Sequence, residues 1–110
     1  MKAAWKGTIA VLSTAPDMCA AEKLADALVA EKLVACVNLI PQIRSIYRWK
    51  DRVQREQEVL LIMKTVRRRL KDVRKRIREL HPYEVPEILV LNVYRGSEEY
   101  LKWISRSVRP

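Results

Sequence analysis

The sequence has little glycine, a single histidine and no phenylalanine. Only 2 of its 110 residues are glycine and 5 are proline, which predicts compact elements joined by short connections. No apolar run approaches the roughly 20 residues that a membrane-spanning helix needs. The first residues, Met1–Lys6, do not lead into the long apolar stretch of a secretory signal peptide. We therefore expect a cytoplasmic protein that is not inserted in a membrane.

Cysteine is also scarce. Cys19 and Cys36 fall in different expected elements, whereas a disulfide scaffold needs denser cysteine. Two cysteines and one histidine at unrelated spacings do not form a closed four-ligand zinc site. We expect Cys36 to behave as a small apolar residue of a strand. Cys19 would lie in the first turn of a helix, where a thiolate is stabilised, but neither cysteine has an evident paired base.

The composition is that of one folded domain, residues 1–110. Apolar residues make up 49% and charged residues 32%, which argues against disorder. The net charge of +9 favours anionic partners, but the excess is concentrated between residues 67 and 78. We interpret this run as the solvated face of one helix and expect no nucleic-acid partner. The strands at 8–13 and 58–65 lack the aromatic residues with which RNA-recognition modules stack bases.

Hydrophobic periodicity predicts alternating strands and helices. We expect strands at residues 8–13, 34–40 (ended by Pro41), 58–66 and 87–94, an extended segment at 44–49 with a hairpin tip at 50–52, and helices at 18–33, 67–80 and after Ser97. Asp17 and Ser97 are suited to cap the first and last helices. The order βαββαβ with a C-terminal helix predicts an α+β, ferredoxin-like fold, in which both main helices cover one face of an antiparallel sheet.

The helices show apolar stripes at helical spacing. The expected packed residues are Ala21, Leu24, Ala25 and Leu28 in the first helix, Val66, Leu70, Val73, Ile77 and Leu80 in the second, and Tyr100, Trp103 and Ile104 in the last. The second helix also offers the pairs Lys75–Glu79 and Asp72–Arg76 one turn apart.

The strands do not alternate apolar and polar residues. In the third strand Leu61 and Met63 point one way, while Leu60 and Ile62 point the other. The helix-free face of such a sheet should be solvated, yet here it is apolar. Since a chain of this length has no spare element to cover that face, we expect a homo-oligomer whose sheets pack together.

Few residues are suited to chemistry. His81 ends a helix and is either a metal ligand or proton shuttle, or simply a helix C-cap. Tyr47, Trp49 and Tyr83 either line a pocket or pack between elements. Lys64 can reach an anion or remain solvated. Carboxylates that could contribute are Glu56, Glu58, Glu84 and Glu87. No catalytic motif or acid–base pair is evident, so we do not expect an enzyme.

Several motifs in this order and spacing resemble the CutA family, the divalent-cation tolerance proteins. They are Thr14-Ala15-Pro16-Asp17, Ala35-Cys36-Val37-Asn38, Tyr47-Arg48-Trp49, Met63-Lys64-Thr65 and His81-Pro82-Tyr83-Glu84-Val85-Pro86, and the resemblance extends from Thr8 to Trp103. It implies a homotrimer similar in architecture to PII signalling proteins, and an association with copper and other divalent metals.

The resemblance also implies a site in a cleft between subunits. Carried over to this sequence, its residues are Tyr47, Trp49, Glu58, Lys64 and Tyr83, with His81 and Cys36 as candidate metal ligands. Some bacterial members have cysteine at the position of Ser13 and histidine at that of Leu80, so a tight copper site of that kind is not expected here. The resemblance favours weak binding of divalent metal, copper included. The alternative is a PII-like sensor that binds a small anion in the same cleft.

Overall fold

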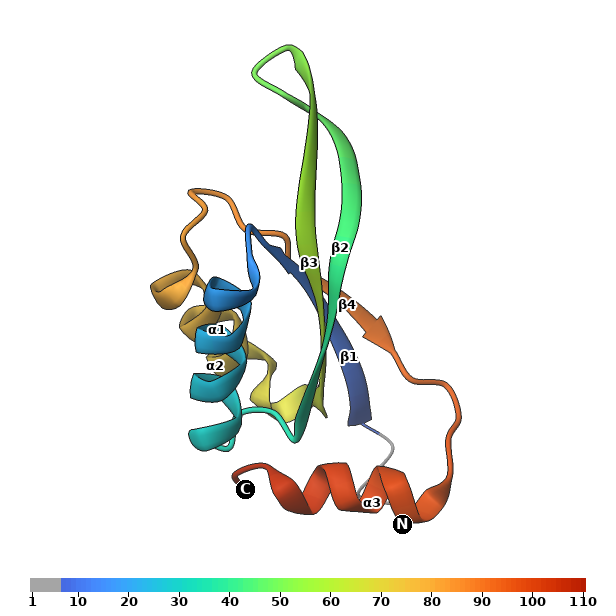
Figure 1. Cartoon of the computed structure of the whole chain (residues 1–110). Coiled ribbons are helices and arrows are strands. Elements are labelled where there is room, and N and C mark those ends of the chain that lie inside the picture. The colour runs from blue at the N-terminus through green and yellow to red at the C-terminus, as the bar shows by residue number, and fades with distance from the viewer. Residues whose placement is uncertain (1–6) are drawn as a thin grey trace.

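The computed structural model describes residues 7–110, so the signal-peptide argument from Met1–Lys6 lies outside the described residues. The elements are β1 (Thr8–Ala15), α1 (Met18–Ala30), β2 (Cys36–Trp49), β3 (Arg52–Val66), a 3₁₀ turn η2 (Arg67–Arg69), α2 (Leu70–Leu80), β4 (Leu89–Asn92) and α3 (Glu98–Ser107). The strands form one antiparallel sheet in the order β2-β3-β1-β4. Helices α1 and α2 lie side by side on one face of it (Figure 1). The predicted α+β, split βαββαβ fold is confirmed.

The predicted boundaries were wrong at several ends. Helix α1 stops at Ala30 instead of residue 33, and Lys32 has a φ of 57°. Strand β2 does not end at Pro41, because Pro41 and Gln42 form a bulge between the pairs Ile40–Leu60 and Ile43–Glu58. Proline has no amide hydrogen to donate to a regular strand ladder, and a position in a bulge does not require that donor. Strand β3 begins six residues earlier than predicted, and β4 spans only four residues.

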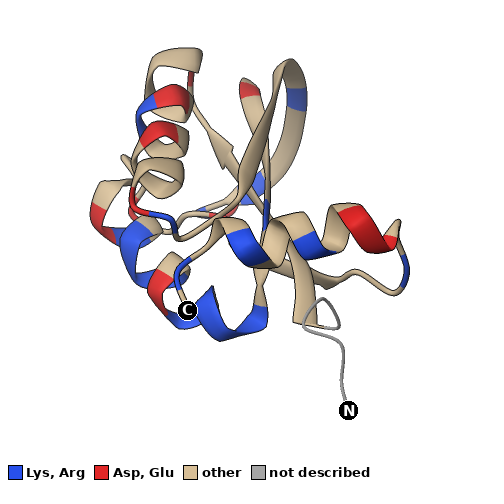
Figure 2. Cartoon of the chain, turned by 90° about the horizontal axis from the view of Figure 1, so that it is seen from below, with Lys and Arg blue, Asp and Glu red and all other residues tan. Residues whose placement is uncertain are grey.

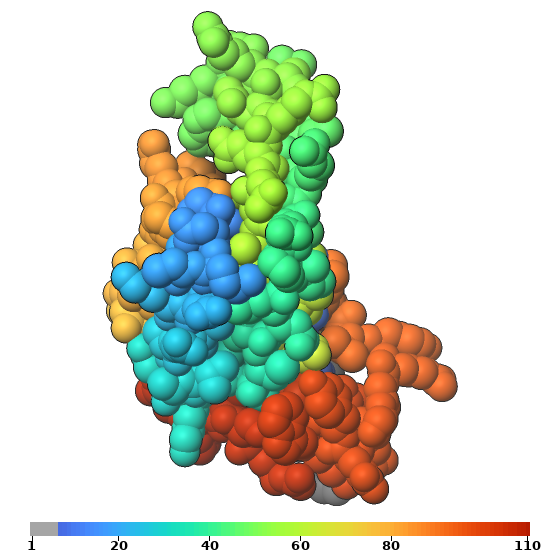
Figure 3. Space-filling view, in the orientation of Figure 1, coloured from blue at the N-terminus to red at the C-terminus, as the bar shows by residue number. Residues whose placement is uncertain are grey.

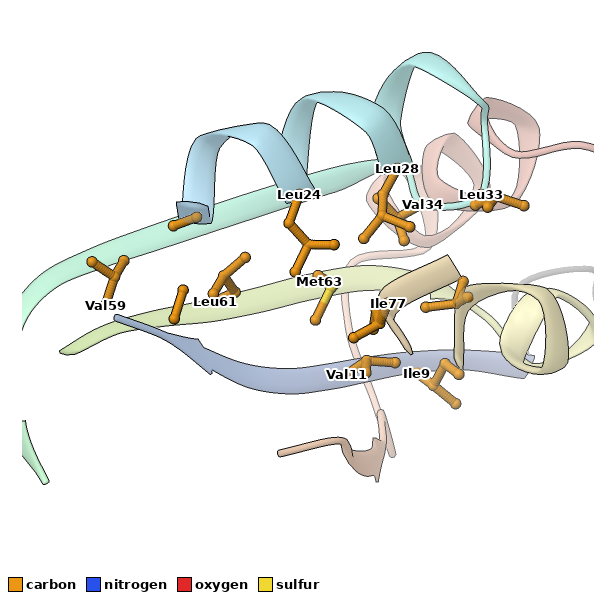
Figure 4. Close-up of a cluster of buried hydrophobic side chains, with 13 residues drawn as sticks. Ile9, Val11, Leu24, Leu28, Leu33, Val34, Val59, Leu61, Met63 and Ile77 are labelled. Carbon is orange, nitrogen blue, oxygen red and sulfur yellow. The ribbon is translucent and has the colours of Figure 1, made fainter. Parts of the chain in front are cut away.

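The hydrophobic core lies between the sheet and the two helices (Figure 4). The predicted stripe of α1 is confirmed, since Ala21, Leu24, Ala25 and Leu28 are its buried residues. Asp17 caps this helix as expected, accepting a hydrogen bond of 2.8 Å from the amide of Ala20. On α2, Val73 and Ile77 are fully buried, but Leu80 at the end of the predicted stripe is 39% exposed.

The packed face of α3 was predicted correctly at Ile104 but wrongly at Tyr100 and Trp103. Its buried residues are Leu101, Ile104 and Ser105, and together with Val108 they follow a helical i, i+3, i+4, i+7 spacing. Tyr100 and Trp103 are 41% and 42% exposed and stack on each other instead. Aromatic size suggested burial, but α3 packs across one end of the sheet against Val66, which leaves its aromatic side exposed.

The ion pairs of α2 also differ from the prediction. Asp72 pairs with Arg69 at 3.2 Å rather than with Arg76. Arg76 instead pairs with Glu31 at the end of α1, at 2.8 Å, and with Glu79 at 3.4 Å. Figure 2 shows that basic residues dominate the ribbon of η2 and α2, and most of them are exposed, as the sequence predicts. The pairing of Arg76 joins the two helices, which spacing along one helix does not reveal.

The face of the sheet turned away from α1 and α2 is apolar. We call it the open face and define it as the apolar residues that alternation places there, Ala10, Leu12, Ile40, Leu60, Ile62, Leu89 and Leu91. The polar residues Thr14, Asn38 and Lys64 lie on the same side of the sheet. Leu89 pairs with Leu12, and Leu91 with Ala10, in adjacent cross-strand rows. Leu89, Leu91 and Ile40 are 54%, 51% and 42% exposed. The prediction of strands that are apolar on both faces is therefore confirmed.

Strands β2 and β3 continue beyond the sheet as a two-stranded hairpin, residues 43–58, which we call the arm. Strand β1 pairs with β3 only from Val59 to Val66, so the arm strands pair only with each other. The arm projects from the body (Figures 1 and 3), and the chain extends 50 Å in that direction against 25 and 22 Å in the others. Its tip is at Lys50 and Asp51, near the prediction, with φ of 51° and 63° as in a tight hairpin turn.

Candidate functional site

A buried carboxylate marks the place where the arm meets the body. Glu58 is only 6% exposed, and its Oε2 accepts a hydrogen bond of 2.6 Å from the Tyr83 hydroxyl. Tyr83 belongs to the connection between α2 and β4, in which Pro82 and Pro86 prevent the helix from continuing. Because β1 ends at Ala15, opposite Val59, no strand covers that side of Glu58, and Tyr83 reaches it there. Two predicted site residues are thus in direct contact.

His81 anchors the same connection. Its Nε2 lies 2.7 Å from the carbonyl oxygen of Thr14, and its Nδ1 accepts a hydrogen bond of 3.0 Å from the Tyr83 amide. A carbonyl only accepts, so Nε2 donates in this bond while Nδ1 accepts from the Tyr83 amide. The His81 amide also bonds to Ile77, so His81 caps α2. Both ring nitrogens are occupied, and a metal ion at either one would have to displace a hydrogen bond.

Tyr47 and Glu56 complete this group on the arm. The pKa of the Tyr47 hydroxyl is raised above its usual value, by desolvation first and then by hydrogen bonding and charge repulsion from Glu56. The pKa of Tyr83 is raised more strongly, because of desolvation and then of its bond to the Glu58 carboxylate. Both phenols are therefore neutral hydrogen-bond donors at ordinary pH. We call the set Tyr47, Glu56, Glu58, His81 and Tyr83 the arm-base cluster.

The other predicted site residues lie elsewhere in the chain. Cys36 and Lys64 are cross-strand partners near α3, where the Lys64 Nζ is 5.7 Å from the Tyr100 ring. Trp49 is next to the tip of the arm, opposite Arg52. Both Lys64 and Arg52 are six residues from Glu58 along β3, about 20 Å at roughly 3.3 Å per residue. One chain therefore does not gather the seven predicted residues into one cleft.

Sequence reasoning missed one contributor and left another unresolved. Thr14 acts through its backbone carbonyl, which no side-chain pattern can reveal. Glu56 was one of four candidate carboxylates, and only the hairpin register brings it near Tyr47, because Tyr47 pairs with Gln54 two residues away. Glu84 and Glu87, the remaining candidates, make no ion pair within residues 7–110.

Residues 7–110 of a single chain form no metal-binding cluster. Among residues 7–110, no three histidine, cysteine or acidic side chains are arranged to hold a metal ion. Cys36 and Cys19 are free thiols, and the nearest polar partner of Cys36 is the Asn38 amide oxygen at 4.0 Å. Ser13 and Leu80 stand where some bacterial members of the family have cysteine and histidine. Ser13 is fully buried with no hydrogen-bond partner for its hydroxyl, and Leu80 is partly exposed. The described residues of one chain therefore hold no assembled set of metal ligands.

Comparison with known proteins identifies the family. Residues 9–107 match the family model described as CutA1 divalent ion tolerance protein. This chain belongs to the CutA1 family. It is 46% identical over 94 residues to the divalent-cation tolerance protein CutA of Thermus thermophilus, covering 86% of this chain and 91% of that protein. The predicted resemblance is confirmed.

Two further relatives extend the comparison. The chloroplastic CutA of Arabidopsis thaliana is 42% identical over 102 residues, which cover 93% of this chain and 56% of that protein. The solved structure of the divalent cation tolerance protein (Cut A1) from Thermus thermophilus superposes with a TM-score of 0.90 at 42% identity. That superposition covers 93% of this chain and 99% of the other. Within residues 7–110, no helix is long and apolar enough to cross a bilayer.

Proposed function

We propose that this chain, as one domain of residues 1–110, acts in divalent-cation tolerance as a homotrimer. In this proposal it binds divalent metal ions, copper included, weakly in clefts between its subunits. The observation that carries the proposal is the apolar open face, which no element of residues 7–110 covers. Family membership supplies the connection to divalent ions.

The open face supports assembly on physical grounds. A patch with Leu89, Leu91 and Ile40 about half exposed costs free energy in water, at roughly 25 cal/mol for each Å² left uncovered. A second and third copy carry the same patch, so a closed ring of identical chains can bury it. The arm favours this arrangement too, since a two-stranded hairpin has little stability unless it packs on something.

The arm-base cluster supports a metal site that is weak and shared. The predicted ligands His81 and Cys36 belong to different ends of the sheet, and His81 must lose a hydrogen bond to coordinate a metal. That loss opposes binding. Glu58 accepts a hydrogen bond from Tyr83, whose ring lies 4.8 Å from that of His81, and Glu56 interacts with Tyr47. Ligands from a neighbouring copy would have to complete the coordination, which is why we propose the clefts between subunits.

The test is a calorimetric Cu(II) titration of the assembled protein. We expect weak binding that Glu56→Gln, Cys36→Ser and His81→Ala each reduce. The matched controls, Glu99→Gln and Cys19→Ser, change exposed residues outside the cluster and should bind as the original does. Thermal unfolding of His81→Ala shows whether that variant still folds. Binding that none of the three substitutions changes would remove the assigned ligands.

We also propose a non-catalytic role in the cytoplasm. The sole histidine has both ring nitrogens occupied, and neither cysteine has a paired base among the described residues. The anion-sensor alternative gains no support from the structure, because Lys64 lies about 20 Å along β3 from the arm-base cluster.

A further inference from the structure

The two faces of the arm differ in charge. Alternation and register place Arg44, Ile46, Arg48, Val53, Arg55 and Gln57 on one face, which we call the basic face. It has three arginines, two aliphatic residues and no acid. The opposite face carries Tyr47, Trp49, Glu56 and Glu58, with one arginine, Arg52, near the tip, and so includes the arm's share of the arm-base cluster.

The basic face has no partner in its own chain. Ile46 and Val53 are 60% and 57% exposed, and every residue of this face is exposed. Within residues 7–110, Arg44, Arg48 and Arg55 form no ion pair. Exposed aliphatic side chains interleaved with unpaired guanidinium groups are typical of a surface that another molecule covers.

Among the described residues, the carboxylates of the arm-base cluster lack a cationic partner, just as the arginines of the basic face lack an acidic one. Glu58 is 6% exposed, and its hydrogen-bond donor is the neutral phenol of Tyr83. Across the described part of the chain, neither Glu56 nor Glu58 has a cation within ion-pair distance. A buried carboxylate is costly unless it is paired. Arg44, Arg48 and Arg55 cannot supply the charge, because they point to the other side of the two strands. Arg52 shares the face of Glu56, but it lies four residues away, about 13 Å at roughly 3.3 Å per residue, and pairs with neither carboxylate.

We propose that the basic face of one arm lies against the arm-base cluster of the next copy, so that its arginines pair with Glu56 and Glu58 there. This inference rests on the proposed oligomer and names the group that completes its site. Two different surfaces of the same chain meet in such a contact, which is heterologous, and repeating it by rotation closes a ring. The arm projects beyond the body and is therefore free to reach a neighbour (Figure 3). Planar guanidinium groups suit carboxylate partners.

The test measures how fast subunits exchange between assemblies. Unlabelled and ¹⁵N-labelled protein are mixed, and native mass spectrometry follows the mixed species. Neutralising the basic face with Arg44→Gln, Arg48→Gln and Arg55→Gln together should speed exchange about tenfold, since loss of a close charge pair acts on dissociation. The matched control removes three charges from α2 with Lys71→Gln, Arg74→Gln and Lys75→Gln, and should exchange like the original protein.

A double-mutant cycle identifies the partner. In a Glu56→Gln background, the triple arginine substitution should speed exchange by clearly less than about tenfold, because one of the two carboxylates that the arginines contact is already neutral. Equal acceleration in both backgrounds would overturn the inference and leave the oligomer standing. If the triple variant exchanges subunits like the original protein but binds DNA less tightly, the inference is overturned in favour of a nucleic-acid surface. A monomeric original protein would instead refute the proposed function.

Discussion

The body and the arm share two strands but are held in place by different means. In the body, β3 lies between β1 and β2 and is covered by α1 and α2, so Leu61 and Met63 are fully buried. In the arm, the same strand pairs only with β2, and Val53 is 57% exposed. The body therefore has a core of its own, whereas the arm has only a hairpin ladder. Within one chain, the arm therefore has much less buried surface than the body to hold it in place.

The largest expected effect tests whether the core is confined to the body. Leu28→Ala removes a fully buried side chain and should lower the free energy of unfolding by about 2–5 kcal/mol. Ile46→Ala on the arm should leave body stability within about 0.5 kcal/mol, as expected for an exposed site. Urea unfolding followed by circular dichroism, under conditions where the chain is dissociated, measures both. Similar losses of unfolding free energy for the two variants would mean that the core is not confined to the body.

The sequence predicted the body better than the arm for a physical reason. The stripe of α1 and the cap at Asp17 are local patterns, and the structure confirms both. The predicted end of β2 relied on Pro41. That proline lies in a bulge that is set by pairing with β3 rather than by neighbours in sequence.

The arm-base cluster was predicted only in part. Motifs identified Glu58, His81 and Tyr83, and the structure places them together. They could not show that the hydrogen bonds of His81 go to a backbone carbonyl and a backbone amide. Nor could they show that Lys64 and Trp49 lie far from the cluster along β3, because that follows from register.

A smaller effect is expected where arm and body join. Tyr83→Phe leaves the buried Glu58 without its hydroxyl donor and should cost about 1–3 kcal/mol at pH 8. The reference is Tyr94→Phe, which changes a tyrosine that is 87% exposed and should be neutral. Urea midpoints of both variants and the original protein provide the comparison. Equal stability of Tyr83→Phe and the original would show that the bond does not tie the arm to the body.

The same tyrosine predicts a dependence on alkaline pH. Folding raises the pKa of Tyr83 above its unfolded value near 10, so the folded state holds this proton more tightly. Its contribution is complete below pH 10 and is lost as the pH rises from 10 through the raised pKa. The stability gap between the original protein and Tyr83→Phe should therefore narrow above pH 10. If this stability difference instead widened above pH 10, folding would lower the pKa of Tyr83 rather than raise it.

The smallest expected effect lies in the body, at the pair that joins its helices. Arg76 makes three hydrogen bonds to Glu31, but both side chains are about one third exposed. Arg76→Gln should cost far less stability than Leu28→Ala, because partly exposed ion pairs contribute little, and the loss should shrink at high salt. Thermal unfolding at low and high salt measures it, with the exposed Arg106→Gln as control. A loss as large as that of Leu28→Ala would mean that ion pairs rather than apolar packing hold the body.

The proposed assembly requires other copies of the chain to cover the open face and the arm. Multi-angle light scattering at micromolar concentration tests this directly on the unmodified protein. We predict three times the mass of one chain, held over a broad range of dilution. A soluble, folded species with the mass of a single chain would contradict the assembly, and with it the shared site at the base of the arm.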